Sequence, residues 1–393
     1  ITTEPWSRSA PDSYGNFQKT GPLPERDRFD QLDEVLRGVS HRLVESLDGR
    51  LLVIPLTGGY DSRLVAMMAR SVGYDRVLCL GSQRRSHWEA RISSEVAERL
   101  GFEWVHFGYE PHQWSAWFRS EERRRYTRDA DGLCALPSIV EWPALLELRR
   151  SGRVPEDAVI VPGHYGNFVT GSSTPEDPAG DGHSGLEAAI RDALLTRYCL
   201  NAWPRAAAGR ALLSSVRDAV QQAAGGAADP DEIVDRWEWR EYQAKQVGLC
   251  VRAYESCGFE WRLPLASNEL VGYWRGVSRA ERFENRLHRR YVEERGRAWS
   301  LPPANPGVVP LSRRRIRRWA RRFGALTHAR KLQRFVRRLD KGRIHRDDEL
   351  GWSCLVDPGE VRRTYTGIEG VESYLVRGWL ESLVTGATSG RGS

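Results

Sequence analysis

Long apolar runs and paired cysteines are both missing from this 393-residue sequence. The longest compact apolar stretch is Leu51–Leu56, far short of the roughly 20 residues that a membrane-spanning helix needs. The six cysteines form no CxxC pair and do not lie at zinc-ligand spacing from a histidine. Scattered cysteines in a chain of this length indicate reduced thiols, so we expect a cytoplasmic protein. No signal peptide is visible, and a start at Ile1 is consistent with a trimmed or processed chain.

Positive charge is present but unevenly distributed. The formal net charge is +7, and much of it lies between Arg313 and Arg346. Residues 312–341 predict one or two basic helices, because apolar residues recur near helical spacing among the arginines. Three interpretations remain open: a solvated hairpin on the core, a segment lying on an anionic membrane surface at the inner face, or a nucleic-acid-binding segment. Nucleic acid is the least favoured partner, since the sequence has no dedicated RNA-binding module.

Strand and helix patterns alternate in the first half of the chain. Continuous apolar runs predict buried parallel strands, and apolar residues at helical spacing predict helices that cover them. This order predicts an α/β fold with a doubly wound parallel sheet, in which ligands bind beyond the carboxyl ends of the strands. The expected strands are 51–56, 76–80, 102–107 and 159–161, and the expected helices are 29–47, 61–72 and 88–100, with Gly101 as a C-cap.

The whole chain divides into four expected parts. An irregular leader comes first, the α/β domain follows, a helical part completes the site, and a basic helical region ends the chain. Helical patterns in the third part include residues 231–254. The expected boundaries of the four parts are 1–26, 27–185, 186–300 and 301–393.

The sharpest signal is a glycine-containing loop directly after the first strand and directly before a helix. Paired glycines let the backbone approach an anion closely, and successive N–H groups at a helix N-terminus form an anion-binding nest. Asp61 supplies a carboxylate that can hold Mg²⁺ against phosphates. An ordinary turn would explain the glycines but not the hydroxyls and the carboxylate around them. The expected nucleotide-binding residues here are Leu56, Thr57, Gly58, Gly59, Tyr60, Asp61 and Ser62.

The segment Thr57-Gly58-Gly59-Tyr60-Asp61-Ser62 resembles the SGGxDS loop of the ATP pyrophosphatases. More specifically, the chain is similar to the synthetase domain of the asparagine synthetase family, above all to short synthase-like proteins of polysaccharide and natural-product pathways. The resemblance implies an adenine nucleotide α-hydrolase-like sheet and the cofactors ATP and Mg²⁺.

Three further segments occur in the family's order and extend the resemblance from about Phe29 to about Tyr291. Gly81-Ser82 lies at the position of a second adenine-side loop. Residues 163–171 resemble the glycine-rich GDELxxG loop, and residues 260–265 resemble the ExRxPfLD segment. The resemblance therefore adds Gly81, Ser82, Gly163 and Gly166 to the expected nucleotide-binding residues.

The reaction that the resemblance implies is ATP-dependent amide formation. A substrate carboxylate attacks the α-phosphorus of ATP, which gives an acyl-adenylate and pyrophosphate, and an amine or ammonia then displaces AMP. Glu260 matches a family glutamate that supports adenylation, although a salt bridge to Arg262 at the surface would explain it equally. The implied catalytic residues are Glu260, Arg252 and Arg286, and the implied metal ligands are Asp61 and Asn167.

The sequence also departs from the family. Asn167 stands where the family has an acidic metal ligand, and Ser267 stands where the last motif ends in Asp. The residues before Leu51 are too few for the family's glutaminase domain, and no cysteine precedes Cys79. We therefore expect the amine directly, or ammonia from a separate glutaminase or other ammonia-supplying partner.

Two other functions and two single residues stay open at this point. A tRNA-modifying ATP pyrophosphatase and a degenerate nucleotide-binding subunit are the alternatives to the ligase. Arg63 could reach a phosphate or form a surface ion pair. His164 could touch a ligand or be an ordinary polar residue with its hydrogen bonds made.

Overall fold

The computed structural model describes residues 25–171 apart from 85, 86 and 133, residue 218, residues 235–304, and parts of 352–380 (352–356, 371, 374–376 and 378–380). The expected domain boundary at 185, the basic segment 312–341 and residues 1–24 of the expected leader lie outside the described residues. Helix α1 begins at Glu25, just inside the limit expected for that leader. Among the helices in the described ranges, none is both long enough and apolar enough to cross a bilayer.

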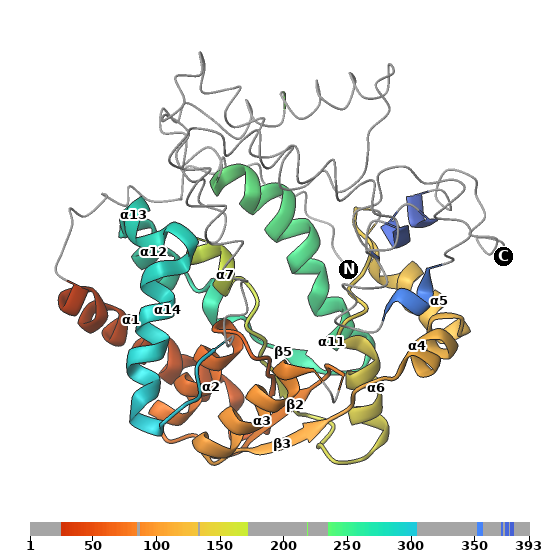
Figure 1. Ribbon diagram of the computed structural model, residues 1–393, viewed down its shortest axis with the longest axis horizontal. Helices are drawn as coiled ribbons and strands as arrows, with labels where there is room; N and C mark the ends of the chain where they lie inside the picture. The colour runs from red at the N-terminus through yellow and green to blue at the C-terminus, as the bar shows by residue number, and fades with distance from the viewer. Residues whose placement is uncertain are drawn as a thin grey trace, which may run out of the picture.

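Five parallel strands form one sheet in the order β3-β2-β1-β4-β5 (Figure 1). The four strands that the apolar runs predict are confirmed, each within one residue at both ends. The fifth strand was not expected, because two residues are too few to show a period and only pairing with β4 makes them a strand. The strands are β1 (Leu52–Pro55), β2 (Val77–Gly81), β3 (Glu103–His106), β4 (Val159–Ile160) and β5 (Glu260–Trp261).

Three helices connect or cover the first strands, as their apolar spacing predicts. Apolar residues along α1 are buried at helical intervals, and the central residues of α2 are buried over most of its length. Gly101 adopts a left-handed conformation (φ 74°) and ends α3, so the predicted C-cap is confirmed. These helices are α1 (Glu25–Leu47), α2 (Asp61–Ser71) and α3 (Trp88–Leu100).

The sequence between β3 and β4 contains helices that the pattern analysis did not predict. A cluster around Trp114 of α4 includes Val356, Val371 and Leu375, so segments near the C-terminus pack against this part of the chain. Figure 1 shows these blue segments beside α4 and α5. The helices are α4 (Pro111–Phe118), α5 (Glu121–Ala130) and α6 (Trp142–Arg150), and the C-terminal turn is η7 (Trp352–Leu355).

The described part of the third region is helical, as expected, but it is not one regular helix over 231–254. A helical segment at 235–238 runs into a π-helix, then a 3₁₀ turn, then a short α-helix. π-Helical segments are rare and occur often at functional sites. The elements are η2 (Trp239–Val247), η3 (Gly248–Val251), α11 (Arg252–Ser256), η4 (Pro264–Ala266), α12 (Asn268–Gly276), α13 (Arg279–Arg282), η5 (Phe283–Asn285), α14 (Arg286–Gly296) and η6 (Arg297–Trp299).

Helices cover both faces of the sheet. Leu52 and Ile54 of β1 pack with residues of α1, α2, α3, α12 and α14, whereas Val53 packs with residues of α5, α6 and α11. Alternate strand residues point to opposite faces, so two separate cores form around one sheet. Figure 1 shows α2 and α14 on one side of the strands and α6 and α11 on the other. The predicted α/β class and the doubly wound arrangement agree with this three-layer structure.

Candidate functional site

The topology places a crevice beside the carboxyl end of β1. From β1 the chain continues through α2 to β2 and β3 on one side, whereas β4 and β5 lie on the other side of β1. Such a reversal of strand order is where open α/β sheets bind ligands. The loop that follows β1 and the loop that follows β4 therefore meet at this point.

Two glycines let the loops touch. A Cβ atom on Gly163 would lie 2.5 Å from the backbone nitrogen of Ser62, and one on Gly166 would lie 2.6 Å from Cγ of Asp61. Both distances are far below ordinary van der Waals contact, so a side chain at either position would push the loop after β1 away. The glycine-rich segment after β4 thus packs directly on the start of α2.

Hydroxyl groups hold the loop after β1 in shape. The backbone N–H of Thr57 donates to Oγ of Ser62 (3.0 Å), and the N–H of Gly59 donates to Oγ1 of Thr57 (3.2 Å). The two hydroxyl oxygens lie 3.2 Å apart. The first N–H groups of α2 have no acceptor within the helix, which leaves donors for an anion at this end.

The start of α3 closes over the loop from another side. A Cβ atom on Gly58 would lie 2.6 Å from Cζ3 of Trp88 and 3.2 Å from Cγ of Glu89. Gly58 is therefore covered by the Trp88 ring, which explains why no larger residue fits there. Trp88 and Glu89 themselves line the cleft above the loop.

A cleft of about 1200 Å³ lies over the loop. Most small-molecule pockets measure roughly 300–1000 Å³, so this cleft has room for a nucleotide and a second substrate. Its walls come from α2, α3, α14, the loops after β1 and β4, and the segment before α6. Its ionisable lining residues are Asp61, Glu89, Arg91, Glu95, Glu141, His164, Arg289 and Glu293.

Asp61, the first residue of α2, contacts a histidine that the sequence analysis did not single out. Nε2 of His288, a buried residue of α14, lies 3.0 Å from Oδ1 of Asp61. Among the described residues, no side chain donates to Oδ2 of Asp61. The carboxylate is thus held through one oxygen, and its residue lines the cleft.

Asn167 lines the same cleft, but its amide oxygen already has a partner. Nδ2 of Asn285 donates to Oδ1 of Asn167 (2.7 Å). Asn285 and the preceding Glu284 both adopt left-handed backbone conformations (φ 58° and 54°), which bring Asn285 to this position before α14 begins. The structure therefore brings Asn167 next to Asp61, as expected, while occupying one lone pair of its oxygen.

Helix α14 and its N-cap residue contribute polar residues to the cleft at four-residue spacing: Asn285 at the N-cap, then Arg289 and Glu293. The hydroxyl of Tyr60 donates to Oε1 of Glu293 (2.6 Å), and the Arg289 guanidinium lies 5.7 Å from the centre of the Tyr60 ring. Burial, and then the bond to Glu293, raise the pKa of Tyr60 to about 12. Arg289 is therefore a cation held beside the phosphate-type loop.

Arg63 has neither of the roles considered from the sequence. Its side chain is buried, and its Nη1 donates to the carbonyl oxygen of Pro302. Burial lowers the pKa of Arg63 to about 10. The residue lies outside the cleft lining and ties α2 to the segment that follows η6.

A second polar group lines the cleft next to the loop after β4. The hydroxyl of Tyr254, a buried residue of α11, donates to Oε2 of Glu141 (2.8 Å), and Nε2 of His164 lies 3.5 Å from the same hydroxyl. Burial raises the pKa of Glu141 and lowers the pKa of His164 to about 4. Sequence reasoning missed this cluster, because its members are separated by many residues and follow no motif.

The structure brings together most of the expected nucleotide-binding residues. Leu56 is buried before the loop, Gly58 of the loop is covered by Trp88, and Gly166 packs on Asp61. Gly81 and Ser82 lie at the carboxyl end of β2, outside the cleft lining. The expected residues that line the cleft are Thr57, Gly59, Tyr60, Asp61, Ser62, Gly163 and Asn167.

The three expected catalytic residues lie outside this cleft. Glu260 pairs across β5 with Val159, level with Leu52 at the amino end of the sheet, whereas the cleft lies at the carboxyl end. Its exposed carboxylate is bound by Arg50 (3.0 Å) and Arg262 (3.2 Å). Glu260 therefore forms the surface salt bridge that the sequence also allowed, and it lies away from the candidate cleft.

Arg252 and Arg286 also lie outside the cleft lining. Arg252 is exposed on α11 and forms an ion pair with Glu255 (2.9 Å). Arg286 is exposed at the start of α14 and does not line the cleft, whereas Arg289, three residues later, does. The resemblance therefore names a residue of the helix that lines the cleft, but not the arginine that does so.

A metal would have few protein ligands here. Within the described ranges, no cluster of three or more His, Cys, Asp or Glu residues could hold a metal ion. Mg²⁺ in nucleotide sites usually takes only one or two carboxylates and completes its shell with phosphates and water. Oδ2 of Asp61 fits that role, and Asn167 could add at most the remaining lone pair of its oxygen.

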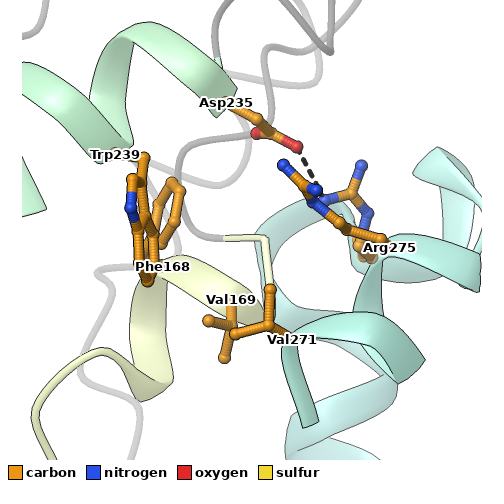
Figure 2. A pocket seen from close by; sticks show the side chains of 7 residues that line it. Phe168, Val169, Asp235, Trp239, Val271 and Arg275 are labelled. Atoms are coloured by element: carbon orange, nitrogen blue, oxygen red, sulfur yellow. Dashed lines mark hydrogen bonds and ion pairs between the residues drawn. The ribbon is translucent and has the colours of Figure 1, made fainter. Parts of the chain in front are cut away.

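A much smaller pocket lies behind the glycine-rich loop. Figure 2 shows it between Phe168 and Val169 of α7 (Gly166–Val169), Val271 of α12, and Trp239. Its volume is about 20 Å³, room for about one water molecule. An ion pair between Asp235 and Arg282 (3.1 Å) closes one side. This pocket is a packing feature rather than a second ligand site.

Comparison with known proteins does not assign the chain to a family. No protein-family model matches the chain, and a comparison with curated proteins gives no match.

Proposed function

We propose that this protein is an ATP-dependent carbon–nitrogen ligase of the asparagine-synthetase type, which activates a carboxylate as an acyl-adenylate and releases pyrophosphate. The observation that carries the proposal is the loop Thr57–Ser62 at the switch point of a parallel sheet, with Gly163 and Gly166 packed on it. An adenine nucleotide α-hydrolase-like fold is consistent with this arrangement. The size of the cleft supports two substrates rather than one.

The phosphate chain of ATP would bind at the loop. The N–H groups at the start of α2 donate to the phosphates, and Arg289 adds positive charge from the facing helix. Mg²⁺, when bound, would neutralise phosphate charge, and Oδ2 of Asp61 is the oxygen that would hold it. His288 orients Asp61 through its other oxygen, so the ligand does not have to order the carboxylate.

The cleft would also exclude water from the acyl-adenylate. Trp88 covers the loop from α3, and the segment 302–304 contributes to the opposite lining. Exclusion of water strengthens the interactions with the departing pyrophosphate and protects the activated acyl group from hydrolysis. An amine that reaches the same cleft can then displace AMP.

The test is the identity of the products. The protein is incubated with Mg-ATP and a panel of carboxylates and amines, and phosphorus NMR follows the nucleotide. AMP and pyrophosphate in equal amounts, absent with Asp61→Ala, are expected. ADP and phosphate as the only products would remove the chain from this class of ligase.

A second candidate is a degenerate nucleotide-binding subunit. The observation in its favour is that Asn167 replaces an acidic ligand and has its oxygen bound by Asn285. Mg-ATP binding without turnover on any carboxylate of the panel would favour this candidate.

A further inference from the structure

Glu141 and Glu293 are the carboxylates of the cleft that form no ion pair among the described residues, and of these two Glu141 is partly buried whereas Glu293 is exposed. Asp61 contacts His288, Glu89 lies 3.8 Å from Nδ1 of His87, and Glu95 lies 4.0 Å from Arg99. Among the described residues, Glu141 forms no ion pair, and its one hydrogen bond comes from the uncharged hydroxyl of Tyr254. A partly desolvated carboxylate without a counter-ion is a favourable place for a ligand cation.

Burial raises the pKa of Glu141, and two features of its position oppose this effect in part. Glu141 is the N-cap residue of α6, and its side chain makes no capping hydrogen bond. The positive end of the helix dipole stabilises a nearby anion, and the Tyr254 hydroxyl does the same, while burial raises the pKa of Glu141. The side chain therefore has a higher proton affinity than an exposed glutamate has.

The contacts around Glu141 connect it to the phosphate-type loop. Tyr254 binds Glu141 and stacks on His164, with ring centres 6.0 Å apart and planes at 24°. His164 directly follows Gly163, which packs on Ser62. Glu141 therefore lines the same cleft as the loop and is linked to it through Tyr254, His164 and Gly163.

We propose that Glu141 binds the ammonium group of a primary amine substrate and accepts a proton from it, with Tyr254 as the positioning residue. This inference rests on the proposed ligase function and adds the substrate class, a primary amine that arrives as a cation. The N–H bond breaks, its proton moves to the carboxylate of Glu141, and the electron pair stays on nitrogen. The neutral amine then attacks the acyl carbon, a C–N bond forms, the C–O bond breaks, AMP leaves with that electron pair, and the second proton passes to water.

The direct test compares a cation with a neutral molecule of similar shape. n-Butylammonium chloride and n-butanol are titrated into the full-length protein at pH 8, and ligand-observed NMR measures their binding. The wild type should prefer the ammonium by about tenfold or more, Glu141→Gln should lose that preference, and Glu147→Gln should keep it. Glu147 is an exposed residue of the same helix, so it is a matched control. Equal preference in the wild type and in Glu141→Gln would overturn the proposal.

Tyr254→Phe tests the positioning role by a pH profile. The hydroxyl lowers the pKa of Glu141, so its removal should move the midpoint of n-butylammonium binding to higher pH. An unchanged midpoint would show that Tyr254 acts only through packing. These titrations contain no ATP, so their outcome is separate from the ligase test. If Glu141→Gln loses the ammonium preference but Asp61→Ala responds to Mg-ATP as the wild type does, the proposed function is refuted and the ammonium site is not.

Discussion

Replacement of Gly166 by alanine tests the packing that defines the site. The added Cβ would lie 2.6 Å from Cγ and 2.7 Å from Oδ1 of Asp61. Carbon atoms in ordinary contact are at least about 3.5 Å apart, so one partner has to move by roughly 1 Å. Gly166 has no positive φ, so the whole cost comes from this contact rather than from the backbone. Overpacking of this kind typically destabilises a protein by about 1–3 kcal/mol.

Movement of Asp61 should also disturb ligand binding, because it changes the 3.0 Å contact with His288. We expect Gly166→Ala to lower the affinity for Mg-ATP by about tenfold or more, measured by calorimetry, and to lower the free energy of unfolding in urea. Gly38→Ala is the control: its Cβ would meet only Nη1 of Arg42, at 3.6 Å, within α1. Alanine should stabilise that helix by about 0.5–1 kcal/mol. Gly166→Ala with wild-type stability and Mg-ATP affinity would refute the packing argument.

Three further changes have defined outcomes. Asn167→Asp keeps an acceptor for Asn285 and adds a negative charge, so calorimetry should show Mg-ATP binding that is stronger by about 1–2 kcal/mol. ATP binding in EDTA should not become stronger, and weaker binding with Mg²⁺ would mean that residue 167 does not face the metal. Glu260→Gln should leave Mg-ATP affinity and turnover unchanged, because its partners lie at the amino end of the sheet; a large loss of turnover would restore its catalytic role. Burial lowers the pKa of His164 from its usual 6.5 to about 4, so the unfolded chain takes up a proton at a higher pH than the folded one does. The free energy of unfolding should therefore fall by up to about 3 kcal/mol as the pH drops from 6.5 to 4. Urea unfolding of His164→Gln should show a smaller fall over this pH range, and an identical fall would contradict this reasoning.

The apolar pattern of short segments was enough to predict the central strands and the loop after β1. The runs that became β1, β2 and β4 are buried on both faces of the sheet, so their apolar character is continuous, whereas the edge strand β3 is only partly buried. The loop after β1 could be predicted because its chemistry is contained in six consecutive residues. Strand β5 could not, since only its pairing with β4 gives it strand geometry.

The remaining site residues depend on contacts between distant segments. Glu141 and Tyr254 meet across 113 positions, and Asp61 and His288 across 227. No single stretch of sequence carries either pair, and no motif marks them. Glu260 lies in a segment resembling a family motif, but a motif does not state which end of a strand its residues occupy. That end is set by the register with β4.

The most direct test of the account is a calorimetric titration of Mg-ATP into the wild type and into Asp61→Ala. The account predicts saturable binding to the wild type, at least about tenfold weaker binding to Asp61→Ala, and the same urea-unfolding cooperativity for both proteins. Equal Mg-ATP affinity in the two proteins, or no binding to the wild type, would contradict the assignment of the loop Thr57–Ser62 as a nucleotide site.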